Sequence, residues 1–545
     1  MFNKKNNLVI TISLFCIILF KRLIFLNLGV NLEEAKDLEA IIKITNGEVL
    51  YRDFYYIYGF LGLYLNAAVF KLFGVADILI PRLIVSLFFA SSVFFAYKIA
   101  LRFVSPFWAF VAVLLGFSGL VTREHTYGHI FAFAGIITSL WAGLSYINER
   151  NLRYLILAGL STGIALISKP LPQGILASFA LMSLLVYEYF FIDKKWNPLP
   201  YVAFILSLLI FPSLGVLYFY SQNALLLFLK SLFPMFSGGA FHPSTYFYIP
   251  SIVPDAFFSA RSLGELKAIL NIYLYQNLRW WLISILFIIG IAYSIRNLYR
   301  DRQNSHFLSV LFLSSFSMVF ELQRILIPGL NPYVSLFPTF VLLIYFGIKI
   351  NTSRHAKQMV QIMIFLLLFL YFIYPPLIYY INYKNNGQPL RLKYADNVIV
   401  KPFTYNAYRE AVSFIKEKTD VADKIVVADY NSFFFLFSER ENLFSENFYL
   451  FSVTTFHPLG KSFSITYKKK ILRENAIIER IKTEKPALVL IPSDYLTANS
   501  IEQSVFLKYI INNWNKCKET GVGTKRTAFD NNIGVTIFCS SERNF

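Results

Sequence analysis

Residues 31–74 read NLEEAKDLEAIIKITNGEVLYRDFYYIYGFLGLYLNAAVFKLFG. This stretch follows a first apolar run, from about residue 8 to residue 28, which is preceded by Lys4 and Lys5. It begins with an acidic segment and ends with residues 55–74, an apolar segment rich in Tyr and Gly. Whether 55–74 crosses a membrane fixes the side on which every later segment lies, so the fold depends on it.

The rest of the chain has the composition of a multi-span membrane protein. Of its 545 residues 56% are hydrophobic and only 15% are charged, against about a quarter in soluble globular chains. Besides the first run, ten apolar runs are long enough to be membrane spans. They lie near 78–97, 105–122, 129–146, 154–168, 173–192, 200–220, 281–297, 306–321, 328–348 and 358–381. Such runs exclude a nucleic-acid-binding protein despite the net charge of +19.

The distribution of Lys and Arg decides how 55–74 lies, because short cytoplasmic loops collect these residues. If 55–74 does not span, fourteen cations lie in the connections on the N-terminal side, and three (Arg123, Lys169 and Arg324) lie in the opposite short loops. If 55–74 spans the membrane, twelve of these fourteen cations would lie in outer loops, against the rule. We therefore expect eleven transmembrane helices, with 55–74 as an interfacial helix and long outer loops at 29–76 and 221–279. The fourteen are Lys4, Lys5, Lys98, Arg102, Arg150, Arg153, Lys194, Lys195, Arg296, Arg300, Arg302, Lys349, Arg354 and Lys357.

The pattern changes after residue 382. Beyond the polar linker YKNNGQP, helix-like segments such as NAYREAVSFIKEK alternate with strand-like ones such as KIVVAD, ALVLIP and GVTIFCSS. The alternation predicts a small α/β domain at 383–545, behind a transmembrane domain at 1–382. The domain lacks a GxGxxG motif and a P-loop. The three cysteines are too few for a disulfide scaffold, and Cys517 and Cys539 are either one disulfide or two free thiols.

The acidic part of the first outer loop is the first candidate for chemistry. Glu33 and Asp37 are four residues apart and share a helix face, whereas Glu34 falls in the apolar arc with Leu38 and Ile41. Carboxylates at the mouth of a membrane cavity suit a general base that takes a proton from an attacking hydroxyl. The alternative is a solvated acidic helix that helps to set the topology. Asp53 follows in the same loop.

A second cluster, Arg123 to His129, lies at the outer end of the third span. Ionisable groups so close to a membrane usually face a cavity or a partner. His125 and His129 have ligand-like i,i+4 spacing, but zinc would need further ligands, and the chain has six His in all. We interpret Arg123, Glu124 and His129 as lining a substrate cavity, or as a plain loop, and we predict no metal site here.

Three isolated cations at outer ends of spans form the third group. They are Arg52, Lys169 (in SKPLPQG) and Arg324 (in ELQRILIPG). Each is able to hold a phosphate or to serve as an interfacial anchor.

The first outer loop resembles that of GT-C membrane glycosyltransferases related to protein O-mannosyltransferases and to the aminoarabinose transferase of lipid A. In those enzymes an acidic pair opens the loop and precedes an Asn-Gly-like turn, a YRDF-like segment and a YGPL-like interfacial helix ending in LFG. Here the pair is Glu33-Glu34, the turn is Asn46-Gly47, and Phe60 stands where YGPL has proline. The stretch from GLSTG (159–163) to Lys169-Pro170 is similar to a transmembrane span that occurs later in these enzymes. Arg324, followed by Asn331-Pro332, is similar to a cationic loop near the end of their transmembrane part.

The resemblance implies a GT-C-like fold and an inverting transfer of a sugar from a polyprenyl-phosphate donor. The transferase is of the hexosyl or pentosyl class, and its acceptor is a lipid, glycan or protein at the outer face. Glu33 takes the place of the usual Asp and Glu34 that of the usual Glu, which leaves open which of the two is the base. Lys169, Arg324 and, less distinctively, Arg52 become donor-phosphate ligands. No organic cofactor is implied, and a divalent-metal requirement stays open.

The sequence thus predicts an α-helical polytopic membrane protein with a small extracytoplasmic α/β domain. It would lie in the plasma (inner) membrane with a cytoplasmic N-terminus. Its partners would be the lipid bilayer, the lipid-linked donor and the acceptor, without nucleic acid. The alternatives are a transporter or flippase for a lipid-linked sugar, which needs neither the acidic loop nor the outer domain, and a non-catalytic membrane subunit with a binding tail.

Overall fold

The computed structural model describes residues 4–540 with gaps. The gaps are 31, 55, 57–58, 119–126, 188, 190–196, 233–282, 302–303, 327–332, 351–373, 429–432, 445–463, 494–495, 497–500, 503 and 521–533. Most of the predicted second outer loop and residues 358–373 of the last predicted span therefore lie outside the described residues.

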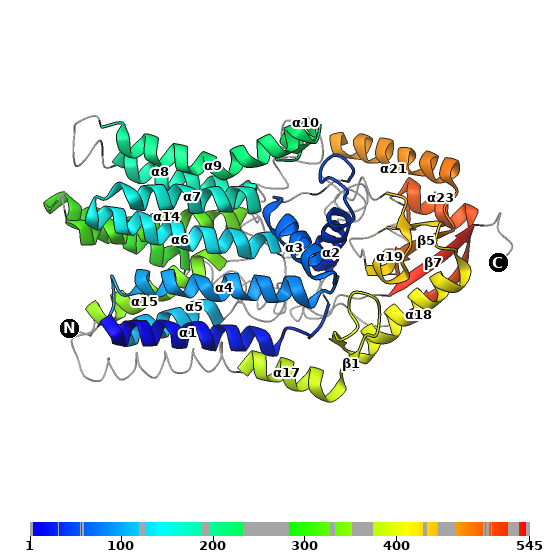
Figure 1. Cartoon of the computed structure of the whole chain (residues 1–545), viewed down its shortest axis with the longest axis horizontal. Coiled ribbons are helices and arrows are strands. Elements are labelled where there is room, and N and C mark those ends of the chain that lie inside the picture. Colours follow the sequence, from blue (N-terminus) through cyan, green and yellow to red (C-terminus); the bar gives the residue numbers. More distant parts are fainter. Residues whose placement is uncertain are drawn as a thin grey trace, which may run out of the picture.

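Apolar helices run side by side in a bundle (Figure 1). They are α1 (Lys4–Ile24), α4 (Leu79–Ala100), α5 (Pro106–Ser118), α6 (Tyr127–Glu149), α7 (Leu152–Ser168), α8 (Ile175–Tyr187), α9 (Leu199–Ser221), α14 (Ser305–Leu326) and α15 (Tyr333–Ile350). A further helical segment spans Ile283–Arg300. Among the described helices five are long and apolar enough to cross a membrane, and shorter apolar helices accompany them. The predicted multi-span helical fold is confirmed.

Small residues let the central helices approach closely. Gly159, in the GLSTG stretch of α7, faces α9, and a Cβ placed there would lie 2.0 Å from Ser207 Oγ and 2.5 Å from the Phe204 carbonyl oxygen. Membrane helices gain contact mainly through such small residues, because lipid offers no hydrophobic drive for helices to associate. The stretch therefore determines how α7 packs on α9.

Shorter helices lie at one end of the bundle. The first outer loop contains α2 (Leu32–Thr45) and α3 (Leu61–Phe73), which lie between the bundle and the C-terminal sheet (Figure 1). The helix expected at 55–74 is thus a helix of 13 residues, which ends at Gly74. After α9 comes α10 (Leu225–Leu232), and α17 (Tyr374–Asn386) leads into the C-terminal part.

The C-terminal part contains a five-stranded mixed sheet in the order β4-β3-β5-β7-β6. Its strands are β3 (Lys424–Val427), β4 (Glu441–Asn442), β5 (Leu488–Pro492), β6 (Trp514–Thr520) and β7 (Val535–Ser540), and its helices are α18 (Pro402–Lys418), α19 (Phe433–Ser438), α21 (Ser464–Glu484) and α23 (Val505–Asn513). β3 pairs in parallel with β4 and β5, whereas β7 runs antiparallel to β5 and β6. The predicted strands and helices of this domain are present, whereas β4, β6 and α19 were not predicted. A small hairpin of β1 (Gln388–Pro389) and β2 (Ile399–Val400) precedes them.

The two faces of the sheet belong to different cores. Ile425, Leu488 and Ile537 point into the large core that includes the membrane helices, α2 and α19. Their neighbours Val426, Val489 and Phe538 point into a separate core with α21 and α23. This alternation is the period-2 pattern of a strand with both faces covered. One face of the sheet is therefore continuous with the core of the bundle.

A disulfide between Cys517 and Cys539 joins β6 to β7. Of the two possibilities that the sequence left open for these cysteines, the structure has the disulfide. Cys16, on α1, is free and exposed.

The N-terminal end of α1 and the C-terminal sheet lie at opposite ends of the bundle (Figure 1). With a cytoplasmic N-terminus, the sheet would lie outside. We therefore expect a membrane-impermeant maleimide to label Cys517, which is exposed, from the outside of intact, mildly reduced cells, whereas Cys539 is buried. A Cys16→Ser background removes the third thiol, and labelling only after the cells are opened would contradict the predicted orientation.

Candidate functional site

The helix α2 places the acidic residues of the first outer loop. Ala35, Leu38 and Ile41 recur at helical spacing on its buried side, and the chain leaves the helix at Asn46-Gly47. Glu34 and Asp37 are both buried, so this helix is not a solvated acidic one.

Glu34 is held by Arg82, which enters from α4. Arg82 Nε donates to Glu34 Oε1 at 2.7 Å and Arg82 Nη2 donates to Oε2 at 2.6 Å, and both side chains are completely buried. The guanidinium also donates to the carbonyl oxygens of Leu26 and Gly29, each at 2.8 Å, in the connection between α1 and α2. Burying two charges is costly unless they pair and fill their hydrogen bonds, and this pair does both. The arrangement fixes α2 on α4.

Asp37 lies one turn further along α2 and accepts a hydrogen bond of 2.5 Å from the Tyr56 hydroxyl. Its neighbour Lys36 is also buried, and burial lowers the pKa of Lys36 to about 8, while the charge of Asp37 opposes this shift. A buried ammonium that titrates near neutral pH is a candidate ligand for an anionic group.

His129 and Lys169 meet below α2. His129 lies in the first turn of α6, and Lys169 follows the last residue of α7. The Lys169 ammonium contacts both ring nitrogens of His129, with Nδ1 at 3.1 Å. Both side chains are buried, and the charge of Lys36 acts on His129. The structure thus brings Lys36, His129 and Lys169 together from three helices, whereas the sequence suggested only the last two.

Gly59, from the YGFL segment, lets the first outer loop approach Lys169. Its N–H donates to the Ser168 carbonyl oxygen at 3.1 Å, and a Cβ at this position would lie 1.9 Å from the Ile167 carbonyl oxygen. Only glycine fits such a contact. This glycine links the YGFL segment to the end of α7.

Arg52 and Asp53 form a more exposed pair at the edge of the site. Arg52 Nε donates to Asp53 Oδ1 at 2.8 Å, and Arg52 Nη1 donates to the Gln222 carbonyl oxygen at 3.4 Å. The hydrogen bond from Arg52 lowers the pKa of Asp53. Arg52 is therefore engaged by a carboxylate, which makes it a weaker phosphate candidate than Lys169.

Some predicted residues cannot be placed. Arg123, Glu124 and His125 lie outside the described residues, as do the side chains of Glu33 and Arg324, whose backbones belong to α2 and α14. Within the described part of the chain, no three His, Cys, Asp or Glu side chains are grouped closely enough to hold a metal ion.

Arg82, Lys36 and Tyr56 were not predicted from the sequence as site residues. Arg82 carried a usable signal, because it is the one charged residue within the apolar run 78–97, and ionisable residues in such runs usually have a partner. Lys36 lies in an acidic stretch of the sequence, and Tyr56 is one of 35 tyrosines, so the sequence does not distinguish either residue as part of a site.

No family model and no curated protein matches the sequence. Solved structures do match its fold. The apo oligosaccharyltransferase of Archaeoglobus fulgidus superposes with a TM-score of 0.53 at 13% identity, over 93% of this chain and 72% of that one. ArnT from Cupriavidus metallidurans, solved with undecaprenyl phosphate, superposes with a TM-score of 0.51 at 11% identity, over 98% of both chains.

Both of these proteins are GT-C glycosyltransferases that use polyprenyl-phosphate carriers. The protein therefore has a GT-C-like membrane fold with a C-terminal mixed-sheet domain, and the resemblance stated from the first outer loop is confirmed at the level of the fold.

The ion pair between Glu34 and Arg82 yields a stability prediction. Arg82→Met leaves a buried carboxylate unpaired and should lower the stability of the detergent-solubilised protein by about 3–5 kcal/mol. The double variant Glu34→Met/Arg82→Met, which buries no charge, should recover most of that loss in a thermal unfolding assay.

Arg153→Met serves as the matched control, because its partner Glu149 is 49% exposed and the pair should contribute less than about 1 kcal/mol. A double variant as unstable as Arg82→Met would show that the charges themselves are not the cause.

Proposed function

We propose that the protein is an integral membrane glycosyltransferase. It transfers a sugar from a polyprenyl-phosphate donor to a hydroxyl of a lipid, glycan or protein at the outer face of the plasma membrane, with inversion at the anomeric carbon. The observation that carries the proposal is that Lys36, which lies beside Asp37 on α2, and Lys169 are both buried and both act on His129, in a GT-C-like fold whose α2 lies between the bundle and the C-terminal sheet (Figure 1).

The reaction is a single displacement. The acceptor oxygen bonds to the anomeric carbon as the bond from that carbon to the phosphate oxygen breaks, so the electron pair leaves with the lipid phosphate. A carboxylate takes the proton of the acceptor hydroxyl. Lys36 and Lys169 neutralise the charge on the departing phosphate, where electrostatic stabilisation contributes most.

We assign the base to Glu33. Both oxygens of Glu34 are engaged by Arg82, so Glu34 suits a positioning role better than proton transfer. Glu33 lies about 100° around α2 from Glu34 and on the face of Asp37, four residues further on. Asp37 and Tyr56 would then support the acceptor.

The remaining candidates line the donor or acceptor path. Arg324 is proposed as a further phosphate ligand, and His129 positions Lys169 through their contact. Asp53 with Arg52, and Arg123 with Glu124, would face the acceptor. A lipid tail would stay in the bilayer while its phosphate reaches these cations.

Glu33→Gln tests the base directly. We expect the turnover number for sugar transfer from a polyprenyl-phosphate donor to fall by about 10²- to 10⁴-fold, because the amide cannot accept the proton. Thermal stability should stay unchanged, since the ion pair between Glu34 and Arg82 remains. The control Glu39→Gln, on the same helix and paired with Lys43, should keep its activity.

Full transfer activity in Glu33→Gln would rule out the assigned base. A wild-type protein that moves a lipid-linked sugar across vesicles without forming a product would favour the transporter instead.

The pKa of Lys36 predicts an alkaline limit to activity. Below about pH 8 the ammonium is charged, and it loses its proton as the pH rises through that value. Because kcat/KM follows the free enzyme, it should fall above about pH 8. Lys36→Arg keeps the positive charge at all these pH values and should abolish the fall of kcat/KM above about pH 8. The control Lys43→Arg should leave the pH dependence of kcat/KM unchanged. If kcat/KM of Lys36→Arg still falls above about pH 8, the deprotonation of Lys36 is not the cause of the fall.

A further inference from the structure

The hairpin that opens the C-terminal part holds the two helices of the Glu34–Arg82 pair. We define residues 388–400 as the clamp. Ile399 N–H donates to the Asn27 carbonyl oxygen at 2.7 Å, and Gly29 N–H donates to the Ile399 carbonyl oxygen at 2.8 Å, in the connection before α2. Ile78 N–H, at the start of α4, donates to the Tyr394 carbonyl oxygen at 3.0 Å. One clamp therefore bonds the N-terminal ends of both α2 and α4.

The same connection also receives Arg82. The carbonyl oxygens of Leu26 and Gly29 accept from the guanidinium, while the peptide groups of Asn27 and Gly29 bond to Ile399. A displacement of the clamp would thus move two of the acceptors that orient Arg82, and through Arg82 it would move Glu34 and α2.

The C-terminal part meets α2 a second time through the α19–β4 corner, residues 433–442. The helix α19 packs against α2, and its five apolar residues are buried in the core that α2 shares. At the far end of α2, burial is the main reason that the pKa of Glu48 is raised; Lys43 lowers it, whereas Asp53, Glu39 and Glu441 of β4 raise it further. The corner therefore follows α2 toward its C-terminal end.

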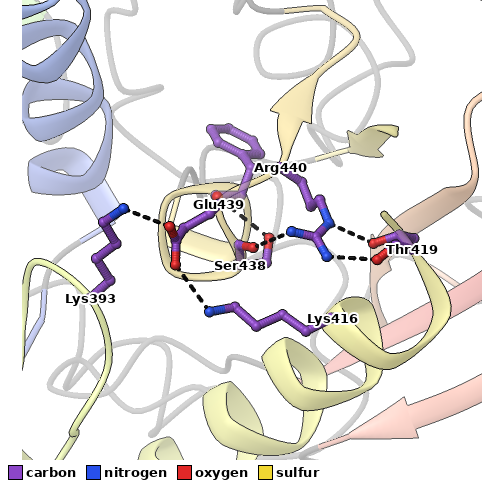
Figure 2. Close-up of polar contacts among 7 residues, drawn as sticks. Lys393, Lys416, Thr419, Ser438, Glu439 and Arg440 are labelled. Carbon is purple, nitrogen blue, oxygen red and sulfur yellow. Dashed lines mark hydrogen bonds and ion pairs between the residues drawn. The ribbon is translucent and has the colours of Figure 1, made fainter. Parts of the chain in front are cut away.

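Glu439 connects the clamp to this corner. It accepts from Lys393 of the clamp at 2.6 Å and from Lys416 of α18 at 3.2 Å, as Figure 2 shows. Glu439 is 40% exposed, so each pair alone contributes little to stability, and it is reversal of the shared charge that would separate the two lysines from it. Its backbone is left-handed, with φ of 61°, which is uncommon outside glycine and has to be held by the surroundings. The next residue, Arg440, fixes the corner by donating to Thr419 Oγ1 at 2.7 Å and to the Ser438 carbonyl oxygen at 3.0 Å (Figure 2).

We propose that the C-terminal domain positions α2 for the transfer reaction, with Glu439 as the positioning residue that joins the clamp to the α19–β4 corner. The domain is then a working part of the membrane site rather than a separate cap. The expected effect on turnover rests on the proposed function. The coupling between the clamp and α2 does not depend on that function.

The test is charge reversal in the full-length protein. Glu439→Lys places three cations together and should release the clamp. We expect hydrogen exchange at the amides of Gly29 and Ile399 to accelerate about tenfold, because their protection reports local opening. The turnover number should fall about tenfold while the donor KM changes less than about twofold, since orientation and not binding is lost. The triple variant Lys393→Glu/Lys416→Glu/Glu439→Lys restores opposite charges and should recover both quantities.

Glu484→Lys is the matched control. Glu484 pairs with Lys424 at 2.9 Å in the same domain and is 29% exposed, but it lies on α21, whose buried face packs into the separate core. Its reversal should leave exchange at Gly29 and Ile399 unchanged. The proposal is overturned if Glu439→Lys leaves this exchange unchanged, or if turnover is unaffected while exchange accelerates. An inactive wild-type protein would instead refute the proposed function, and the exchange measurement would still decide the coupling.

Discussion

The buried ion pair between Glu34 and Arg82 is the interaction on which the rest of the site depends. Neither charge would be tolerated alone in this interior, and the pair is stable because the guanidinium also donates to two backbone carbonyl oxygens. Those carbonyl groups belong to the turn between α1 and α2. A single side chain therefore fixes a membrane helix, a turn and the acidic helix relative to one another.

The cations around α2 have different environments, and their roles differ accordingly. Arg82 is fully engaged by a carboxylate and by the backbone, and Arg52 is bound to Asp53 near solvent. Lys169 contacts the imidazole of His129, and burial lowers the pKa of Lys36 to about 8. Lys36 and Lys169 are thus buried cations whose described contacts differ from those of Arg82 and Arg52.

The sequence predicted the helical segments, a helix within 55–74 and the C-terminal α/β domain because these depend on local properties. Apolar run length, hydrophobic periodicity and loop charge are all readable from neighbouring residues. The acidic loop was found for the same reason, since Glu33, Glu34 and Asp37 are close in sequence. The strand β6 was missed because four successive residues, Asn515 to Lys518, are exposed and show no alternation of apolar and polar side chains. Its place at the sheet edge comes from pairing with β7.

The sequence by itself determined that this chain crosses a membrane repeatedly, that an acidic helix follows the first span, and that a folded domain follows the last. Only the tertiary structure decided which charges meet. Glu34 and Arg82 are 48 residues apart, His129 and Lys169 are 40 apart, and Lys393 and Glu439 are 46 apart. Charges so far apart in sequence carry no local signal of their partners, because it is the packing of the helices and of the clamp that brings them into contact. For that reason the sequence could name carboxylates as candidates, whereas the separation of Glu34 as a structural partner from Glu33 as the proposed base required the fold.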